Sequence, residues 1–141
     1  MKLAKVFHRP HRVTYAECTA GNHVYYGRYL DILEEARGEF FRSLGKPLLA
    51  WQENDTIFPV IECRLRYLSP ARYDDCLSIR VWLVGLEGVR LAFGYDIRNE
   101  TDKLILEAEI THVCTTLQEK PKRVPVELKE MLTDFLKPVQ P

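Results

Sequence analysis

The sequence predicts an α+β fold in which a long antiparallel sheet wraps around one central helix. Residues 27–44 repeat their apolar residues with the period of a helix, and most of the chain after residue 60 alternates apolar and polar residues, as strands do. Turn-forming residues separate the alternating runs at hairpin spacing, which is typical of antiparallel strands. At 141 residues the chain is of single-domain size, so we expect one domain over residues 1–141.

The first predicted elements are a strand at 10–17, a sharp turn at Gly21-Asn22 and the helix at 27–44. Glycine and asparagine are the residues that most readily adopt a positive φ, which a sharp reversal requires. The helical stripe is broad, which predicts a well-buried helix, and Gly45 supplies its end. The apolar positions on this stripe are Tyr29, Leu33, Ala36, Phe40 and Leu44.

Four long antiparallel strands are expected next, followed by a final amphipathic helix at about 126–136. One face of the sheet would be buried on the helix, because each strand alternates its side chains between two faces. A long free strand edge invites pairing with another chain, so we expect a homo-oligomer. The alternating runs are Ile61 to Tyr67, Ile79 to Leu83, Val89 to Ile97, and Leu104 to about Leu117.

Composition argues against several classes of function. Lys and Arg together number 20, as do Asp and Glu, so nothing indicates the basic surface of a nucleic-acid-binding protein. No apolar run approaches the ~18 residues of a membrane-spanning helix, and the first residues lack the apolar core of a signal peptide. The four cysteines, at positions 18, 63, 76 and 114, form no C-x-x-C pair. We therefore expect no metal site and no membrane insertion, and we expect a cytoplasmic protein with reduced thiols.

Polar residues gather just before the predicted helix, in the segment YAECTAGNHVYYG. The first turn of a helix has unpaired backbone N–H groups and the positive end of the helix dipole, which can hold an oxyanion. Thr19, Asn22 and His23 precede this helix start and add hydrogen-bonding groups and one group that titrates near neutral pH. Arg37 falls inside the apolar stripe, so it needs an acidic partner such as Glu34 or Glu17.

Each of these residues also has a purely structural interpretation. Asn22 and His23 fit a turn, Arg37 with Glu34 fits a structural ion pair, and Cys18 fits a passive thiol. His112, on a predicted strand, fits a core or interface histidine. Composition and spacing alone predict no more than a candidate polar site at a helix N-terminus.

Four ordered blocks give the whole chain a resemblance to a known family. They are YAECTAGNHVYYGRYLDILEEARGEFFRSLG, RYLSPARYDDCLSI, EAEITHVCTTL and EKPKRVPVEL. The chain resembles the hotdog-fold thioesterases of the 4-hydroxybenzoyl-CoA thioesterase family, notably the Tol-Pal-associated acyl-CoA thioesterases. The resemblance implies a hotdog fold, a homodimer or homotetramer formed by sheet extension, and active sites at the dimer interface.

The resemblance also implies hydrolysis of an acyl-CoA or acyl-carrier-protein thioester. The backbone N–H of Tyr26 would polarise the thioester carbonyl, and an acidic loop residue would act as nucleophile or general base. No separate cofactor is implied, because CoA or phosphopantetheine arrives as part of the substrate. We expect the substrate to contact Tyr29, Glu34, Lys122 and Arg123. The last two could face the phosphates of CoA, or could belong to a solvated turn.

The chain departs from the family pattern at the usual catalytic aspartate, where it has Thr19. Three outcomes follow: Thr19, Asn22 and His23 orient the attacking water; Glu17 or His23 acts as the base; or catalysis is lost and the protein only binds acyl thioesters. The first outcome is similar to the enediyne polyketide thioesterases, a non-acidic group whose pattern Tyr29 and Arg37 match. Hydrolysis is the function that we expect, and a non-catalytic binding or scaffold protein is the alternative. A hotdog dehydratase is less supported, because its paired His and Glu are not evident.

Overall fold

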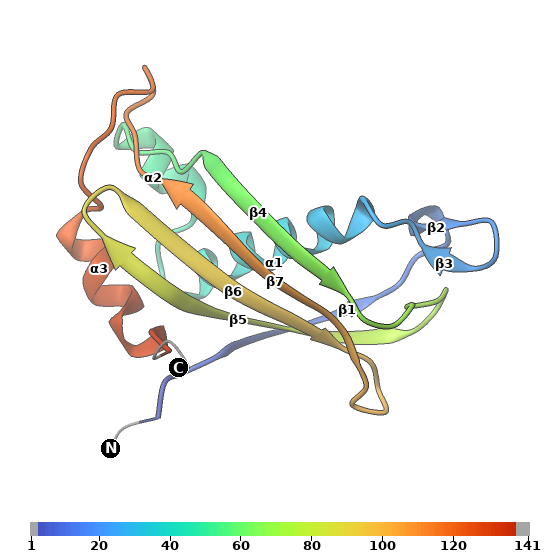
Figure 1. Ribbon diagram of the computed structural model, residues 1–141. Helices are drawn as coiled ribbons and strands as arrows, with labels where there is room; N and C mark the ends of the chain where they lie inside the picture. The colour runs from blue at the N-terminus through green and yellow to red at the C-terminus, as the bar shows by residue number, and fades with distance from the viewer. Residues whose placement is uncertain (1–2, 138–141) are drawn as a thin grey trace.

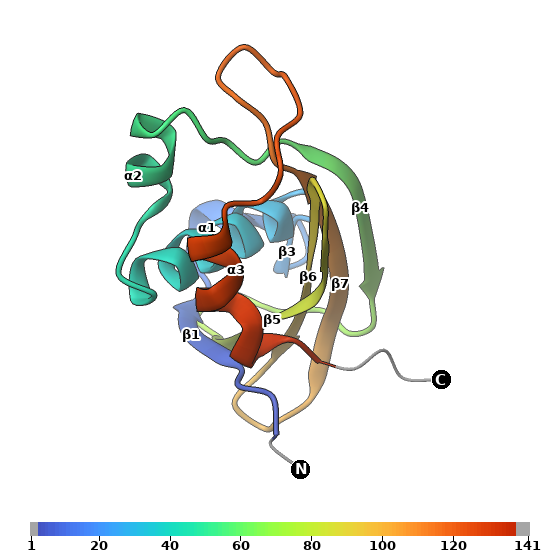
Figure 2. The ribbon, with the colours of Figure 1, turned by 90° about the vertical axis from the view of Figure 1, so that its left-hand side faces the viewer.

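Five strands form one antiparallel sheet in the order β1-β5-β6-β7-β4, and the long helix α1 lies in its curve (Figures 1 and 2). The computed structural model describes residues 3–137. The sheet strands are β1 (Phe7–Arg12), β4 (Val60–Tyr67), β5 (Cys76–Glu87), β6 (Arg90–Arg98) and β7 (Leu104–Val113). A separate small hairpin consists of β2 (Cys18–Thr19) and β3 (His23–Val24). The helices are α1 (Arg28–Ser43), α2 (Leu48–Glu53) and α3 (Val126–Leu132), with single 3₁₀ turns at Tyr15–Glu17 and Thr133–Phe135. The predicted α+β architecture is confirmed.

The core lies between α1 and the inner face of the sheet. The predicted helical stripe is buried from Tyr29 to Phe40, while Leu44 at its end is half-buried. Phe40 and Phe41 make edge-on ring contacts with Phe93 of β6 at 6.1 and 6.0 Å. Aromatic pairs at this distance add to the stabilisation from area burial alone. The buried α1 positions are Tyr29, Ile32, Leu33, Ala36, Arg37, Phe40 and Phe41. Arg37 is therefore buried, as its position on the stripe predicted.

The strand expected at 10–17 is wrong in its bounds, because β1 ends at Arg12. The Glu17 carboxylate accepts hydrogen bonds from the backbone N–H of Thr14 at 2.7 Å and from its hydroxyl at 3.0 Å. These bonds close the 3₁₀ turn Tyr15–Glu17, which ends the extended conformation. The alternation of apolar and polar residues, which includes Val13 and Tyr15, thus extends beyond the end of the strand.

Two further bounds differ from the prediction. Strand β7 ends at Val113 rather than near Leu117, because Thr115 bridges Ile57 on one side and Pro121 on the other as the chain turns back. The final helix stops at Leu132 and tightens into a 3₁₀ turn. Within residues 3–137, no helix has the length and apolar character needed to cross a membrane.

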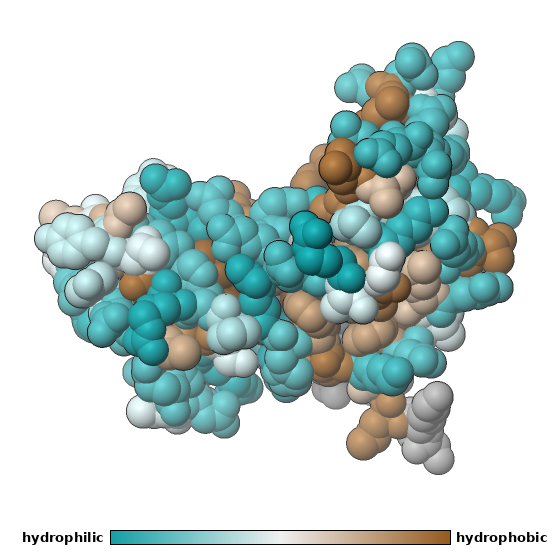
Figure 3. Space-filling model, turned by 180° about the vertical axis from the view of Figure 1, so that it is seen from behind, coloured by the Kyte–Doolittle hydropathy of each residue, from teal (hydrophilic) through white to brown (hydrophobic). Residues whose placement is uncertain are grey.

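The edge strand β4 leaves apolar side chains uncovered. On the same side of the sheet as the core, Ile61 and Tyr67 are 48% and 49% exposed, whereas Ile79 of β5 is fully buried. The opposite edge, β1, is interrupted by Pro10, which blocks strand addition. Strand β4 contains no proline. From behind, the molecule narrows between its two ends, and one end rises above the rest (Figure 3).

Candidate active site

The β2–β3 hairpin and the start of α1 form one corner of the molecule, at the end of β4 (Figure 1). Thr19 pairs with His23 across the hairpin, and the connecting loop has positive φ angles of 90° at Gly21 and 60° at Asn22. The Asn22 side-chain carbonyl accepts a hydrogen bond from the backbone N–H of Tyr73 at 3.1 Å. The turn interpretation of Asn22 is confirmed, and its side chain also ties the hairpin to the segment before β5.

The start of α1 presents backbone N–H groups without partners. Gly27 is the N-cap residue, and no side chain caps the helix there. The N–H of Tyr25 donates to the Glu17 carbonyl at 2.8 Å, but within residues 3–137 the N–H groups of Tyr26 and Gly27 have no acceptor. Such groups, at the positive end of a helix dipole, favour a negatively charged oxygen.

A hollow of about 360 Å³ adjoins this helix start. Its lining residues are His23, Val24, Tyr26, Tyr29, Tyr67, Leu68, Ser69 and Pro70. The Tyr67 hydroxyl donates to the Tyr26 carbonyl at 3.2 Å, and burial raises the pKa of Tyr67, which keeps this donor protonated. The Tyr67 ring also contacts the rings of Tyr26 and Tyr29, at 6.4 and 5.7 Å. Sequence reasoning missed Tyr67 as a site residue, although its place at the end of an alternating run was visible.

Thr19 and Asn22 face a different hollow, of about 450 Å³. It is lined by Tyr15, Cys18, Thr19, Ala20, Gly21, Asn22 and Tyr73. On the hairpin, therefore, His23 lines the hollow beside the helix start, and Thr19 lines the second hollow. Burial and the charge of Glu17 raise the pKa of the Cys18 thiol, which agrees with a passive thiol.

Glu17 is engaged in holding the turn before the hairpin. Besides the bonds from Thr14, its two carboxylate oxygens lie 2.9 and 3.0 Å from His11 Nε2. Burial raises the pKa of Glu17, but the hydrogen bonds from Thr14 and His11 outweigh it, and the net pKa lies below the usual 4.5. A carboxylate with these partners is a weaker base than a free one.

Replacing Glu17 with glutamine should lower thermal stability while leaving kcat within a few-fold of wild type. The substitution removes charge-assisted hydrogen bonds that are each worth roughly 1.5–3 kcal/mol, less the part lost to solvent screening. Thermal unfolding and acyl-CoA hydrolysis should be measured on the same preparation. A loss of kcat by 100-fold or more at unchanged stability would instead assign Glu17 the role of base.

Arg37 lies in a second polar cluster, two helical turns beyond Tyr29. Eight residues of helix correspond to about 12 Å along its axis. Arg37 is 8% exposed, forms an ion pair with Glu34, and lines a hollow of about 190 Å³. The other residues around this hollow are Leu48, Gln52, Thr56, Ile57 and Phe58. The structure confirms the pairing with Glu34, while Glu17 pairs elsewhere.

His112 of β7 completes this cluster and is fully buried. Its Nδ1 lies 2.9 Å from the Phe58 carbonyl and 3.2 Å from Arg37 Nη1. A carbonyl only accepts and a guanidinium only donates, so Nδ1 cannot form hydrogen bonds with both groups at once, and the shorter contact, with Phe58, fits the tautomer that carries the proton on Nδ1. Burial and the charge of Arg37 lower the pKa of His112 to about 4, so the imidazole is neutral at pH 7. Within residues 3–137, His112 Nε2 and Arg37 Nε are buried without a hydrogen-bond partner.

Acid should destabilise the protein through His112. The folded state holds this histidine at a pKa of about 4 against an ordinary 6.5, so the unfolded chain takes up the proton first. The contribution of His112 to the unfolding free energy is constant above pH 6.5 and is lost as the pH falls toward 4. The difference between the two pKa values corresponds to roughly 3 kcal/mol. Urea unfolding at several pH values should show this slope, and His112→Asn should flatten it. Equal slopes in both proteins would contradict the assignment.

Lys122 and Arg123 lie at the end of the molecule that holds Arg37. The Lys122 ammonium donates to the Asp55 carbonyl at 3.2 Å and to the Thr56 hydroxyl at 2.9 Å, so two of its three N–H groups hold a loop. The Arg123 side chain is exposed. A single chain thus divides the predicted site residues between two clusters: Glu17, Thr19, Asn22, His23, Tyr26 and Tyr29 at the corner, and Glu34, Arg37, Lys122 and Arg123 beyond it.

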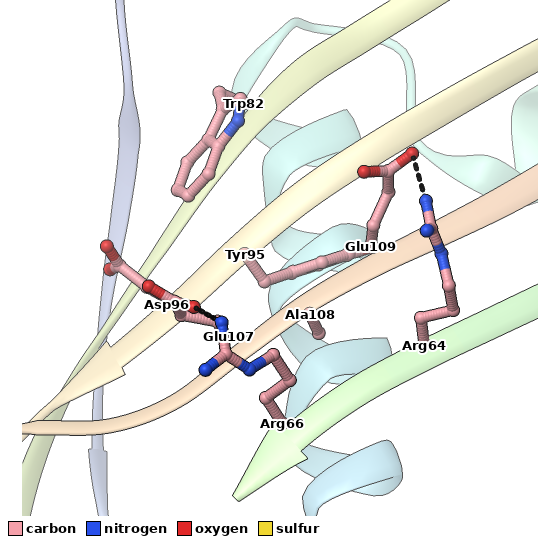
Figure 4. Close-up of a pocket in the computed structure, with 8 residues that line it drawn as sticks. All are labelled: Arg64, Arg66, Trp82, Tyr95, Asp96, Glu107, Ala108 and Glu109. Carbon is pink, nitrogen blue, oxygen red and sulfur yellow. Dashed lines mark hydrogen bonds and ion pairs between the residues drawn. The ribbon is translucent and has the colours of Figure 1, made fainter. Parts of the chain in front are cut away.

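A further hollow, of about 390 Å³, lies on the outer face of the sheet (Figure 4). Its charged side chains already pair across strands: Arg64 with Glu109 at 3.2 Å, and Arg66 with Glu107 at 3.5 Å. Asp96 is paired with Arg80. None of the predicted site residues lines this hollow. Ion pairs that satisfy one another on an exposed sheet face are typical of a solvated surface.

Comparison with known proteins identifies the family of the chain. Residues 21–106 match the thioesterase superfamily. The acyl-CoA thioester hydrolase YbgC of Escherichia coli is 33% identical, and the match covers 92% of this chain and 96% of that protein. The long-chain acyl-CoA thioesterase FadM of the same species is 31% identical over 82% of this chain and 88% of its own length.

Solved structures agree with this match. The crystal structure of a hypothetical protein from Aquifex aeolicus superposes with a TM-score of 0.85 at 28% identity, covering 89% of this chain and 98% of that one. Both the expected hotdog fold and the expected thioester hydrolase are therefore confirmed. On these matches and on its architecture, the chain belongs to the thioesterase superfamily.

Proposed function

We propose that the chain hydrolyses acyl-CoA thioesters at the corner formed by the β2–β3 hairpin and the start of α1. The main observation that supports this proposal is that the backbone N–H groups of Tyr26 and Gly27 are unpaired within residues 3–137. A thioester carbonyl beside them is polarised, and its oxygen becomes negative when water adds to the carbon. The tetrahedral intermediate then collapses, expelling the CoA thiolate, which takes up a proton, and leaving the free acid.

Thr19, Asn22 and His23 are proposed to orient the attacking water, His23 from the hollow beside the helix start and Thr19 and Asn22 from the neighbouring hollow on the other side of the hairpin. Thr19 has no carboxylate to act as base or nucleophile, so the attack depends on positioning and on the polarised carbonyl. The Asn22 carbonyl is already bonded to Tyr73, which leaves its amide N–H groups for water or substrate. If His23 serves as the base instead, its loss should lower kcat by roughly 10²–10⁴-fold.

Strand β4 is proposed to pair with β4 of a second copy and to form the homodimer. Its uncovered apolar residues and free edge support this pairing. Directly opposed residues of two antiparallel strands share a face, so Ile61, Cys63 and Leu65 would face their counterparts. One register that satisfies this condition places Glu62 opposite the partner's Arg64. Opposite charges in such pairs are favourable.

A cytoplasmic location is also proposed. Its support is the state of the cysteines, since Cys18, Cys63, Cys76 and Cys114 are all free thiols. Unpaired thiols are typical of a reducing compartment.

Release of free thiol from a panel of short, medium, long and aromatic acyl-CoAs tests the proposed hydrolysis. An acyl-carrier-protein thioester should be included as a second carrier. Wild type should be compared with Thr19→Asp, Asn22→Ala, His23→Ala and Arg37→Ala. Turnover by wild type that falls in the Asn22 or His23 variants, in protein that remains oligomeric, would support a hydrolase with a non-acidic site.

The departure at Thr19 is the ground for the alternative, a protein that binds acyl thioesters without cleaving them. That alternative predicts no turnover by wild type and a gain of turnover in Thr19→Asp, because the aspartate would restore the missing acid–base group. A well-placed group of this kind typically contributes 10²–10⁴-fold.

A further inference from the structure

Tyr67 reaches the corner from the end of β4, and its backbone, ring and hydroxyl are all held there (Figure 1). Its backbone pairs with Leu106 of β7, and its ring makes edge-on contacts with the rings of Tyr26 and Tyr29. Its hydroxyl donates to the Tyr26 carbonyl at 3.2 Å. A hydroxyl on a strand residue whose ring is packed in this way is well fixed in direction.

The Tyr26 carbonyl depends on this hydroxyl, because the helix does not reach it. The first N–H groups of α1 donate to the carbonyls of Tyr25 at 2.8 Å and Gly27 at 3.3 Å, which lie on either side of Tyr26. Within residues 3–137, the Tyr67 hydroxyl is the only group that donates to the Tyr26 carbonyl. Burial raises the pKa of Tyr67, so the hydroxyl keeps the proton that this bond requires.

The two unpaired N–H groups of the corner are each aimed by a hydrogen bond to the opposite edge of their own peptide. A trans peptide is planar, and its C=O and N–H groups point in opposite directions. The peptide that carries the Tyr26 N–H also carries the Tyr25 carbonyl, which the N–H of Arg28 holds. The next peptide carries the Gly27 N–H and the Tyr26 carbonyl, which Tyr67 holds. The helix therefore aims the first N–H, and a side chain from β4 aims the second.

We propose that Tyr67 is a positioning residue for thioester hydrolysis, because its hydroxyl fixes the peptide that presents the Gly27 N–H to the oxyanion. This inference rests on the proposed hydrolysis at the corner. Donors to an oxyanion are effective when they are oriented before the charge develops, since no free energy is then spent on turning them during the reaction. Without the hydroxyl, the Gly27 N–H remains, but its peptide is free to rotate and to turn its carbonyl toward water.

Replacing Tyr67 with phenylalanine removes the hydroxyl and keeps the ring with its contacts. Tyr67→Phe should lower kcat for acyl-CoA hydrolysis about 10-fold, less than the roughly 10²–10³-fold effect of removing a donor outright. KM and thermal stability should stay nearly unchanged. Tyr25→Phe is the matched control, because it removes the hydroxyl of an exposed tyrosine in the same segment and should keep the wild-type kcat. Equal kcat values in the two variants, or a change in KM alone, would overturn the proposal.

Infrared spectroscopy of a bound carbonyl distinguishes positioning from a general loss of structure. The probe is a ketone analogue of an acyl-CoA, in which a methylene group replaces the thioester sulfur and the carbonyl is isotopically labelled. Hydrogen bonds to a carbonyl oxygen lower its stretching frequency, so the frequency should rise in Tyr67→Phe and stay at the wild-type value in Tyr25→Phe. An unchanged frequency in Tyr67→Phe would show that Tyr67 does not act through the backbone donors. A wild type that releases no thiol from any acyl-CoA would instead overturn the proposed function.

Discussion

Replacing Tyr26 with proline is expected to lower kcat for acyl-CoA hydrolysis by about 100- to 1,000-fold, the effect of removing one oxyanion-binding donor. Proline has no backbone N–H, so this change removes the donor that faces the thioester oxygen. The Tyr26 side chain is exposed, and within residues 3–137 its N–H has no partner in the folded chain. The substitution therefore breaks no hydrogen bond that holds the fold together.

Tyr26→Ala is the matched control, because it removes the ring and keeps the N–H. It should retain most of the activity, with any change appearing mainly in KM. Circular dichroism and gel filtration would establish that both variants fold and assemble alike. Similar kcat values in the two variants would show that the Tyr26 N–H does not polarise the carbonyl.

Replacing Ile61 with aspartate is expected to separate the dimer into folded, inactive monomers. Ile61 is half exposed in the single chain, so a charge there costs the monomer little. In the proposed dimer the same position would be buried against the second copy, where an unpaired charge costs several kcal/mol. The dimer dissociation constant should rise roughly a thousand-fold, which corresponds to about 4 kcal/mol. Sedimentation velocity over a range of concentrations would measure it.

Glu107→Gln is the control for Ile61→Asp, because Glu107 lies on the outer face of the sheet in an exposed ion pair with Arg66. Such pairs contribute little, so this variant should remain dimeric and active. If the Ile61→Asp variant remains dimeric and active, the interface does not lie at β4.

The helix and the long strands could be predicted because their periodic patterns coincide with burial. The stripe at Tyr29, Leu33 and Phe40 identified α1 within one residue at each end. The predicted bounds of the first strand were wrong because alternation alone does not reveal a competing local interaction, here the hydrogen bond that the Thr14 backbone N–H donates to the Glu17 carboxylate. Local side-chain hydrogen bonds of this kind end a strand without changing its hydropathy pattern.

The candidate site could be predicted only where its residues are close in sequence. The unpaired N–H groups follow from the start of a helix, which the sequence locates. The bond from Tyr67 to Tyr26 spans 41 residues, and the contacts of Lys122 with Asp55 and Thr56 span more. No periodic pattern encodes such pairs. The position of Arg37 likewise depends on residues that are distant in sequence. The sheet brings His112 beside Arg37, and the Phe58 carbonyl lies beside His112.

Tyr67 belongs to two parts of the molecule at once, as the last residue of the edge strand and as the donor to the Tyr26 carbonyl. Through that single hydrogen bond, the geometry of the helix start depends on the geometry of β4. Dimer formation and catalytic activity should therefore be coupled, so that only the dimer is active. Serial dilution should lower the activity per molecule along the same curve as dimer dissociation, so that protein concentration alone sets the fraction of working sites.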